Sequence, residues 1–163
     1  MRDINTGQRT GRFGKEAGMA QGAAGNVARM NRSHKGGAVP PDTFVIEAER
    51  LLELSRTDLV REERLTWAYR AALRAAGAVI QFARKKRRRL PPGSAWEKVR
   101  ALAGDEEMET WCRRFAPHAR LVAQVEMGLV PDLSEAQVTE VYQDACDFLD
   151  VVRGRVGYLP EVA

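Results

Sequence analysis

The spacing of apolar residues becomes helical after Pro40 and Pro41. From that point on, large apolar side chains recur at steps of three and four residues, which places them on one face of an α-helix. No segment alternates apolar and polar residues in the way that a half-buried strand would. The pattern predicts helices over residues 43–56, 59–85 and 95–103, a fourth from about Asp105 and a fifth from about Ser134. We therefore expect an all-α fold, an antiparallel up-down bundle of four to five helices.

Two of the predicted helices begin with a capping box. Ser94 is followed three residues later by Glu97, and Ser134 by Gln137. In this motif each side chain accepts a hydrogen bond from the other residue's backbone amide. Two N–H groups at the start of the helix, which have no partner within the helix, are satisfied in this way. Trp96 follows the first box, and we expect its indole to cover the core rather than to stack on a nucleic-acid base.

Three further positions carry local expectations. Asp42 or Thr43 is placed to cap the first helix. Gly77 interrupts a series of alanines in the second helix, where small side chains would let a neighbouring helix approach closely. Pro117 lies inside the fourth helix and predicts a kink there.

The chain divides into a tail, a helical domain and a short end. Residues 1–41 carry seven basic and two acidic side chains and few large apolar ones, so we expect this segment to be disordered. Residues 42–157 form the predicted bundle, and residues 158–163 a C-terminal tail. The N-terminal segment could make weak, salt-sensitive phosphate contacts or have no role of its own.

Six consecutive basic residues end the second predicted helix. They are Arg84, Lys85, Lys86, Arg87, Arg88 and Arg89. Six charges surround a helix completely and leave no apolar face, so the run must project beyond the bundle or unwind into a loop. One or two cations would offset the helix dipole, and six exceed that need. Two interpretations stay open: a contact for RNA or another polyanion, and a solvated corner.

The fifth predicted helix has an acidic side made of Glu140, Asp144, Asp147 and Asp150. A metal site in a helical bundle needs inward carboxylates or histidines from a second helix, and the pattern offers no matching set. We therefore expect this side to be solvated, and we expect neither a metal nor a cofactor.

The cysteines and the hydropathy bear on location. Cys112 and Cys146 lie far apart among apolar neighbours, which is typical of buried free thiols in a reducing compartment. No run of apolar residues approaches the length needed to span a bilayer. We expect a cytoplasmic protein with no membrane contact.

The order of these segments resembles a known family. The segments are "EAERLLELSRTDLVREERLTWAYRAALRAAGAVI", the basic run, "SAWEKVRALAG", an aromatic helix and "DACDFLDVV". In this pattern residues 43–156 resemble the HEPN domains, in particular a small actinobacterial branch, the SAV-type HEPN family. The resemblance implies an up-down helical domain that is often a homodimer. Its relatives include metal-independent ribonucleases and non-catalytic modules that bind RNA or a protein partner.

The ribonucleases of this family use an arginine, four to six intervening residues and a histidine. Arg113 and His118 have this spacing. The histidine would shuttle a proton while the arginine neutralises the attacked phosphate. The motif departs from the family pattern, because Arg114 follows the arginine and Pro117 interrupts it. The start of the fifth helix, where the family places the motif, contains neither residue type, so we expect His118 to be a surface or kink-lining residue.

Three functions follow from these observations. The first is a HEPN-like module that binds RNA or a protein partner without catalysis. The second is a metal-independent, toxin-like ribonuclease that uses Arg113 and His118. The third is a helical adaptor with no nucleic-acid role, whose basic run docks on an acidic protein surface.

Overall fold

The computed structural model describes residues 37–84 and 89–160. The predictions for residues 1–36, for residues 85–88 of the basic run and for the last three residues lie outside this part of the chain. Within it there are five helices and no strand, which confirms the all-α fold class. The helices are α2 (Pro41–Thr57), α3 (Arg61–Arg84), α4 (Ala95–Ala103), α5 (Glu106–Glu126) and α6 (Glu135–Val156).

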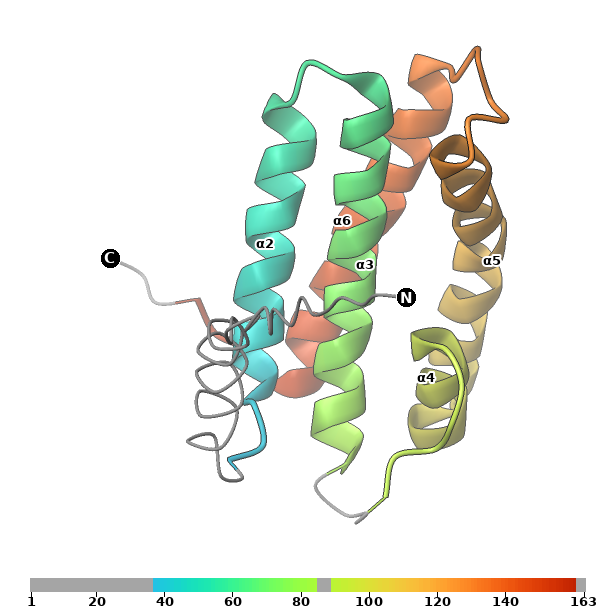
Figure 1. Cartoon of the computed structure of the whole chain (residues 1–163). Coiled ribbons are helices and arrows are strands. Elements are labelled where there is room, and N and C mark those ends of the chain that lie inside the picture. Colours follow the sequence, from blue (N-terminus) through green and yellow to red (C-terminus); the bar gives the residue numbers. More distant parts are fainter. Residues whose placement is uncertain (1–36, 85–88, 161–163) are drawn as a thin grey trace, which may run out of the picture. The chain divides into compact units, whose positions relative to one another are not determined.

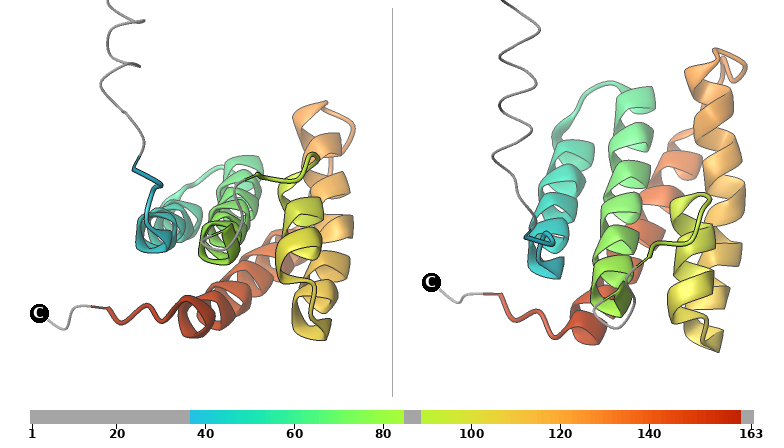
Figure 2. Two further views of the ribbon diagram at one scale, coloured as in Figure 1. Left: turned by 90° about the horizontal axis from the view of Figure 1, so that it is seen from below. Right: turned by 60° about the horizontal axis from the view of Figure 1, so that its bottom comes forward.

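The central element of the bundle is α3, which contacts each of the other four helices. Figure 1 shows α2 and α3 as an antiparallel hairpin, with α5 and the short α4 on the other side of α3. The view from below in Figure 2 shows α6 across one side of this hairpin, and α6 contacts both of its helices. The opposite side of the α2–α3 hairpin carries no helix of the described chain.

Small side chains allow this close arrangement around α3. Its buried residues include Ala68, Ala71, Ala72, Ala75, Ala76 and Ala78. At Gly77 even a methyl group would not fit without movement, because an added Cβ would lie 2.6 Å from Cδ1 of Phe44 on α2. The sequence prediction that this stretch serves tight packing is confirmed.

Aromatic rings join α4 and α5 to α6. Trp96 of α4 stacks on Phe115 of α5 with ring centroids 4.7 Å apart, and Phe115 lies 5.5 Å from Phe148 of α6. The Trp96 Nε1–H donates to the Tyr69 hydroxyl of α3 at 3.0 Å, so the buried indole has a polar partner. Trp96 therefore covers the core, as the sequence predicts.

Both predicted capping boxes are present, at Ser94 with Glu97 and at Ser134 with Gln137. The predicted cap of the first helix is wrong. The helix starts at Pro41 without a side-chain cap, because a proline at this position has its φ already set for a helix and lacks the amide that a cap would satisfy.

The packing at Gly77 predicts the sign of a substitution. We expect Gly77→Ala to lower the free energy of unfolding by about 1 kcal/mol. Alanine gains about 1 kcal/mol of helix propensity over glycine, but the clash of its methyl group with Phe44 costs more than this gain. Urea unfolding measures the change.

Gly154 is the matched control, because it also lies inside a helix and an added Cβ there meets nothing within 4 Å. Gly154→Ala should raise the free energy of unfolding by about 0.5–1 kcal/mol. Equal stabilisation by both substitutions would contradict the packing argument.

Candidate functional site

Arg113 and His118, the pair with the ribonuclease spacing, both lie on α5. Five residues of an α-helix rotate a side chain by about 500°, which leaves the two directions roughly 140° apart. Arg113 is exposed, and its guanidinium donates to the Thr110 hydroxyl at 3.4 Å. His118 is only 5% exposed and faces α6. The structure therefore does not bring these two side chains together.

His118 instead pairs with an aspartate. Its Nε2 lies 2.7 Å from Oδ2 of Asp144 on α6, and Asp144 is 4% exposed. The other carboxylate oxygen forms an ion pair with Arg114, whose Nε lies 2.9 Å away. The edge of the His118 ring contacts Phe115, with centroids 5.6 Å apart. The expectation of a surface histidine and that of a solvated Asp144 are both wrong, because each residue satisfies the other inside the α5–α6 contact.

The buried pair of His118 and Asp144 and its exposed neighbours Arg114 and Glu140 form two pairs of residues with the same spacing. Arg114 and His118 are four residues apart on α5, as are Glu140 and Asp144 on α6, and such a spacing puts both members of a pair on one side of the helix. This was the signal in the sequence that could have revealed the group. The expectation that no second helix offers a matching ligand type is corrected by His118.

The same residues are a candidate set of metal ligands. Donor atoms of His118, Glu140 and Asp144 lie within 4.8 Å of one another. Imidazole and carboxylate together suit divalent transition metals. However, both oxygens of Asp144 already bond, one to His118 and one to the guanidinium of Arg114. The arrangement is thus a hydrogen-bonded link between helices in which an arginine neutralises the buried carboxylate.

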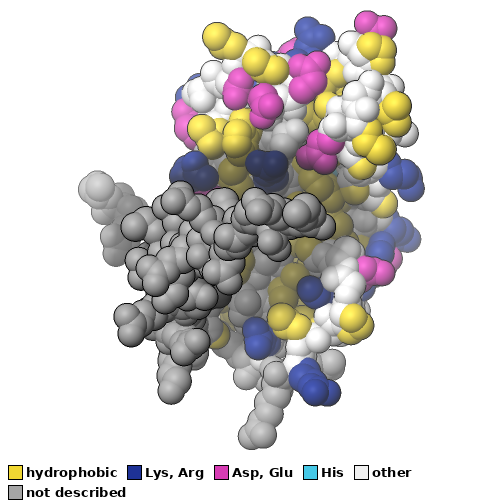
Figure 3. Space-filling view, in the orientation of Figure 1, with side chains coloured by type: hydrophobic (Ala, Val, Ile, Leu, Met, Phe, Trp, Pro, Cys, Tyr) yellow, Lys and Arg dark blue, Asp and Glu magenta, His cyan; other side chains and the backbone are white. Residues whose placement is uncertain are grey.

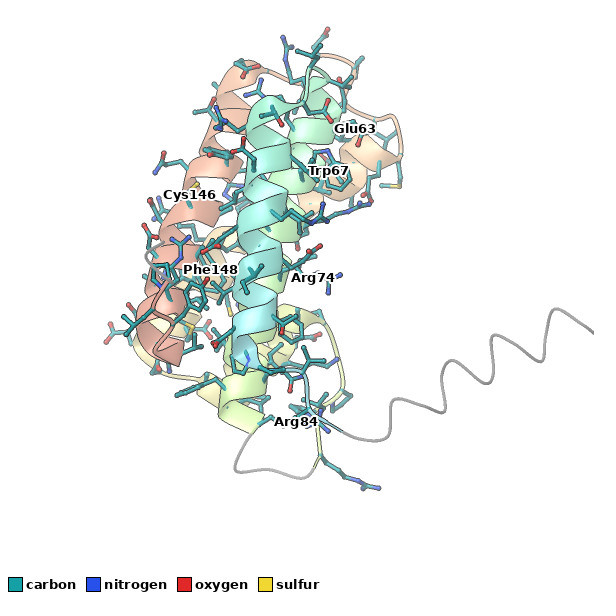
Figure 4. All side chains as sticks on the ribbon, turned by 90° about the vertical axis from the view of Figure 1, so that its left-hand side faces the viewer. Glu63, Trp67, Arg74, Arg84, Cys146 and Phe148 are labelled. Carbon is teal, nitrogen blue, oxygen red and sulfur yellow. The ribbon has the colours of Figure 1, made fainter. Side chains whose placement is uncertain are left out.

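The basic run has two residues in the described part of the chain. Arg84 is the last residue of α3 and is partly buried, whereas Arg89 is exposed. Lys85, Lys86, Arg87 and Arg88 lie outside it, so their role stays a prediction. Arg84 places the start of the run at the lower end of the bundle (Figure 4).

Two more arginines lie further up α3, on the side that faces away from α6. We call this side the outer side of α3. Figure 4 shows Trp67, Arg74 and Arg84 along one side of the bundle. Arg70 and Arg74 are exposed, and among the described residues neither forms an ion pair within 4.0 Å. In the space-filling view of this side, acidic side chains gather mainly near the top, while basic ones occur at mid-height and towards the base (Figure 3).

Between α2 and α3 this side is hollowed into a groove of about 490 Å³. It is lined by Glu47, Arg50, Leu51, Trp67, Arg70, Leu73 and Arg74, and we call it the Trp67 groove. Arg50 bonds Glu47 at 2.8 Å, and this hydrogen bond holds the pKa of the Glu47 carboxyl below its usual value. Glu47 therefore stays ionised, and the groove keeps three guanidinium groups against one carboxylate.

Neither cysteine is an activated nucleophile. Cys112 is buried and Cys146 partly buried, and both are free thiols. Burial raises the pKa of both, which keeps them in the unreactive protonated form. The expectation of buried free thiols is confirmed for Cys112, whereas Cys146 is free but only partly buried.

The buried link between α5 and α6 makes a prediction about stability. Asp144→Asn removes the charge that Arg114 and His118 share, and we expect it to lower the free energy of unfolding by about 2–3 kcal/mol. Thermal or urea unfolding measures the loss.

Asp147→Asn makes the same chemical change at an exposed position three residues further along α6, and it should stay within about 0.5 kcal/mol of the parent. Similar losses from both variants would show that the Asp144 link contributes nothing specific.

Comparisons with known proteins agree with this architecture. The family model described as SAV_6107-like HEPN matches residues 56–153, from the last turn of α2 to the last turn of α6. No curated protein and no solved structure matches the chain significantly. Among the described helices, none has the length and hydropathy required to cross a bilayer.

Proposed function

Because the chain belongs to the SAV_6107-like HEPN family, we propose that it is a helical module that binds RNA and does not cleave it. The observation that carries the proposal is the row of exposed guanidinium groups on the outer side of α3. Arg70 and Arg74 have no ion-pair partner within the described chain, and the same side leads to Arg84, where the basic run begins.

Guanidinium groups suit this task chemically. An arginine can donate two parallel hydrogen bonds to a phosphate and keeps its charge at every physiological pH. An exposed arginine that forms no ion pair can accept a phosphate without first breaking a salt bridge within the described chain. The six residues from Arg84 to Arg89 would add further phosphate contacts at the end of the same helix.

The placement of His118 supports binding without cleavage. A general acid or base must reach the proton that it transfers, directly or through one water. The Nε2 of His118 already bonds Asp144 inside the helix contact, and Arg113 faces another direction. A phosphodiester at the surface would meet these two residues at separate places, so they would not act on one bond.

The first test is the salt dependence of RNA binding. Each phosphate contact releases counterions, so log K should fall with log salt by about 0.7 per contact for a single strand. Changing Arg87, Arg88 and Arg89 together to Gln should weaken binding and make the slope shallower by about two. Fluorescence anisotropy with labelled RNA measures both quantities.

Arg120→Gln is the matched control, because Arg120 is an exposed arginine of α5, a helix that lies on the other side of α3 from α2, and it should leave the slope unchanged. If the intact chain binds no RNA even at low salt, the proposal is wrong and the protein is better described as an adaptor.

The second test concerns cleavage. We expect labelled RNA to stay intact with the purified chain in the presence of a chelator. Arg113→Gln is the decisive variant, since the exposed side chain can be changed without touching the core. Metal-independent cleavage that Arg113→Gln abolishes while the melting temperature is kept would make the protein a ribonuclease.

A further inference from the structure

The Trp67 groove contains an indole whose position is fixed before any ligand arrives. The Nε1–H of Trp67 donates to Oδ2 of Asp58 at 3.2 Å, and Asp58 lies in the turn between α2 and α3. One face of the ring lies under the guanidinium of Arg70, with Cζ 5.2 Å from the ring centroid. Trp67 is only partly buried, so the indole packs against the core and also lines the groove.

Two cations that form no ion pair within 4.0 Å among the described residues line the same groove, and one of them, Arg74, lies close enough to Glu47 to lower the pKa of its carboxyl. Arg70 and Arg74 are four residues apart on α3, which separates them by about 6 Å along the helix axis. Leu51 and Leu73 give the groove an apolar part, and its volume of about 490 Å³ lies within the range of ligand clefts, roughly 300–1,000 Å³. The groove thus combines an indole that Arg70 partly covers, an apolar wall and an excess of positive charge.

We propose that the Trp67 groove is a subsite for single-stranded RNA, in which an unpaired base stacks on Trp67 while Arg70 and Arg74 contact the adjoining phosphates. This inference rests on the proposed RNA binding and adds the form of RNA and the residues that select it. Proteins that bind single strands commonly combine these two elements, aromatic stacking and a basic groove.

The indole is the reason to choose an unpaired RNA. In a duplex the bases stack on one another, so no base face is available to an aromatic side chain. An acidic peptide could pair with the arginines, but it offers no ring for the indole. Of these three ligands, a single strand alone satisfies both kinds of group at once.

The distance to the basic run explains how the two regions would act together. Trp67 and Arg84 are separated by 17 residues of one continuous helix, a rise of about 25 Å. A dinucleotide would fill the Trp67 groove alone, whereas a longer strand could also reach Arg84. The groove and the basic end are therefore two parts of one track along α3.

The test uses the full chain and an oligouridylate of about 12 nucleotides, a length within the site sizes of single-strand-binding folds. Trp67→Leu should weaken binding about tenfold or more and leave the salt slope unchanged, because it removes stacking and no charge. Trp67→Phe keeps a ring and should recover most of the affinity. Arg74→Gln should instead make the salt slope shallower by about 0.7, and Arg120→Gln should not.

Two further readouts separate this subsite from a merely structural role of Trp67. Oligouridylate should quench tryptophan fluorescence in the parent and much less in Trp67→Phe, with equal melting temperatures. An RNA duplex of the same length should bind the parent and Trp67→Leu equally.

The outcomes distinguish the two proposals. If Trp67→Leu and Arg74→Gln bind oligouridylate like the parent while the triple variant of Arg87, Arg88 and Arg89 loses affinity, the groove is not a subsite and RNA binding stands. If the parent binds no RNA, both proposals fail. Displacement of bound oligouridylate by polyglutamate with equal efficiency in the parent and in Trp67→Leu would assign the groove to an acidic protein partner and overturn the stacking subsite.

Discussion

The close approach of neighbouring helices to α3 is the constraint on which the rest of the structure depends. Alanines on its buried sides bring backbones near, but they contribute little volume to the core. The bulk must come from the partners, and it does so in Phe44 of α2 above Gly77 and in Phe115 and Phe148 beyond α3. Although α3 contacts all four other helices, Arg70 and Arg74 remain exposed on its outer side, and the Trp67 groove lies there.

Helix α5 is held by aromatic contacts and a buried charged link rather than by the packing of small residues. Its aromatic rings contact Trp96 and Phe148, and the burial of apolar surface has no directional requirement. The carboxylate of Asp144 does have one, because a shift of α5 along α6 would leave a buried charge without its partners His118 and Arg114. The aromatic contacts hold α5 in place, and the charged link fixes its position along α6.

The sequence predicted the features that depend on neighbours along the chain. Helix positions, both capping boxes and the packing role of Gly77 follow from periodicity and short-range chemistry, and the structure confirms them. The pairing of His118 with Asp144 joins positions 26 residues apart on two helices. Periodicity shows which side of a helix is apolar, but not which residue of another helix lies opposite.

In the candidate site too, features that depend on neighbours along the chain were predicted, and features that depend on contacts between helices were not. A fixed spacing suggested that Arg113 and His118 act together, yet on a helix that spacing turns the side chains away from each other. The Trp67 groove could not be predicted, because it exists only where α2 and α3 meet at a particular rotation. Residues of the basic run were recognised from charge alone, which required no geometry.

The guanidinium that covers Trp67 gives the groove an internal competitor. Arg70 already occupies one face of the indole, so an arriving ring must share the tryptophan or displace the arginine. A flat apolar molecule would replace one favourable contact by another and gain little. A ligand that carries an anion next to its ring gives the displaced arginine a new partner, so the exchange favours molecules that present both groups together.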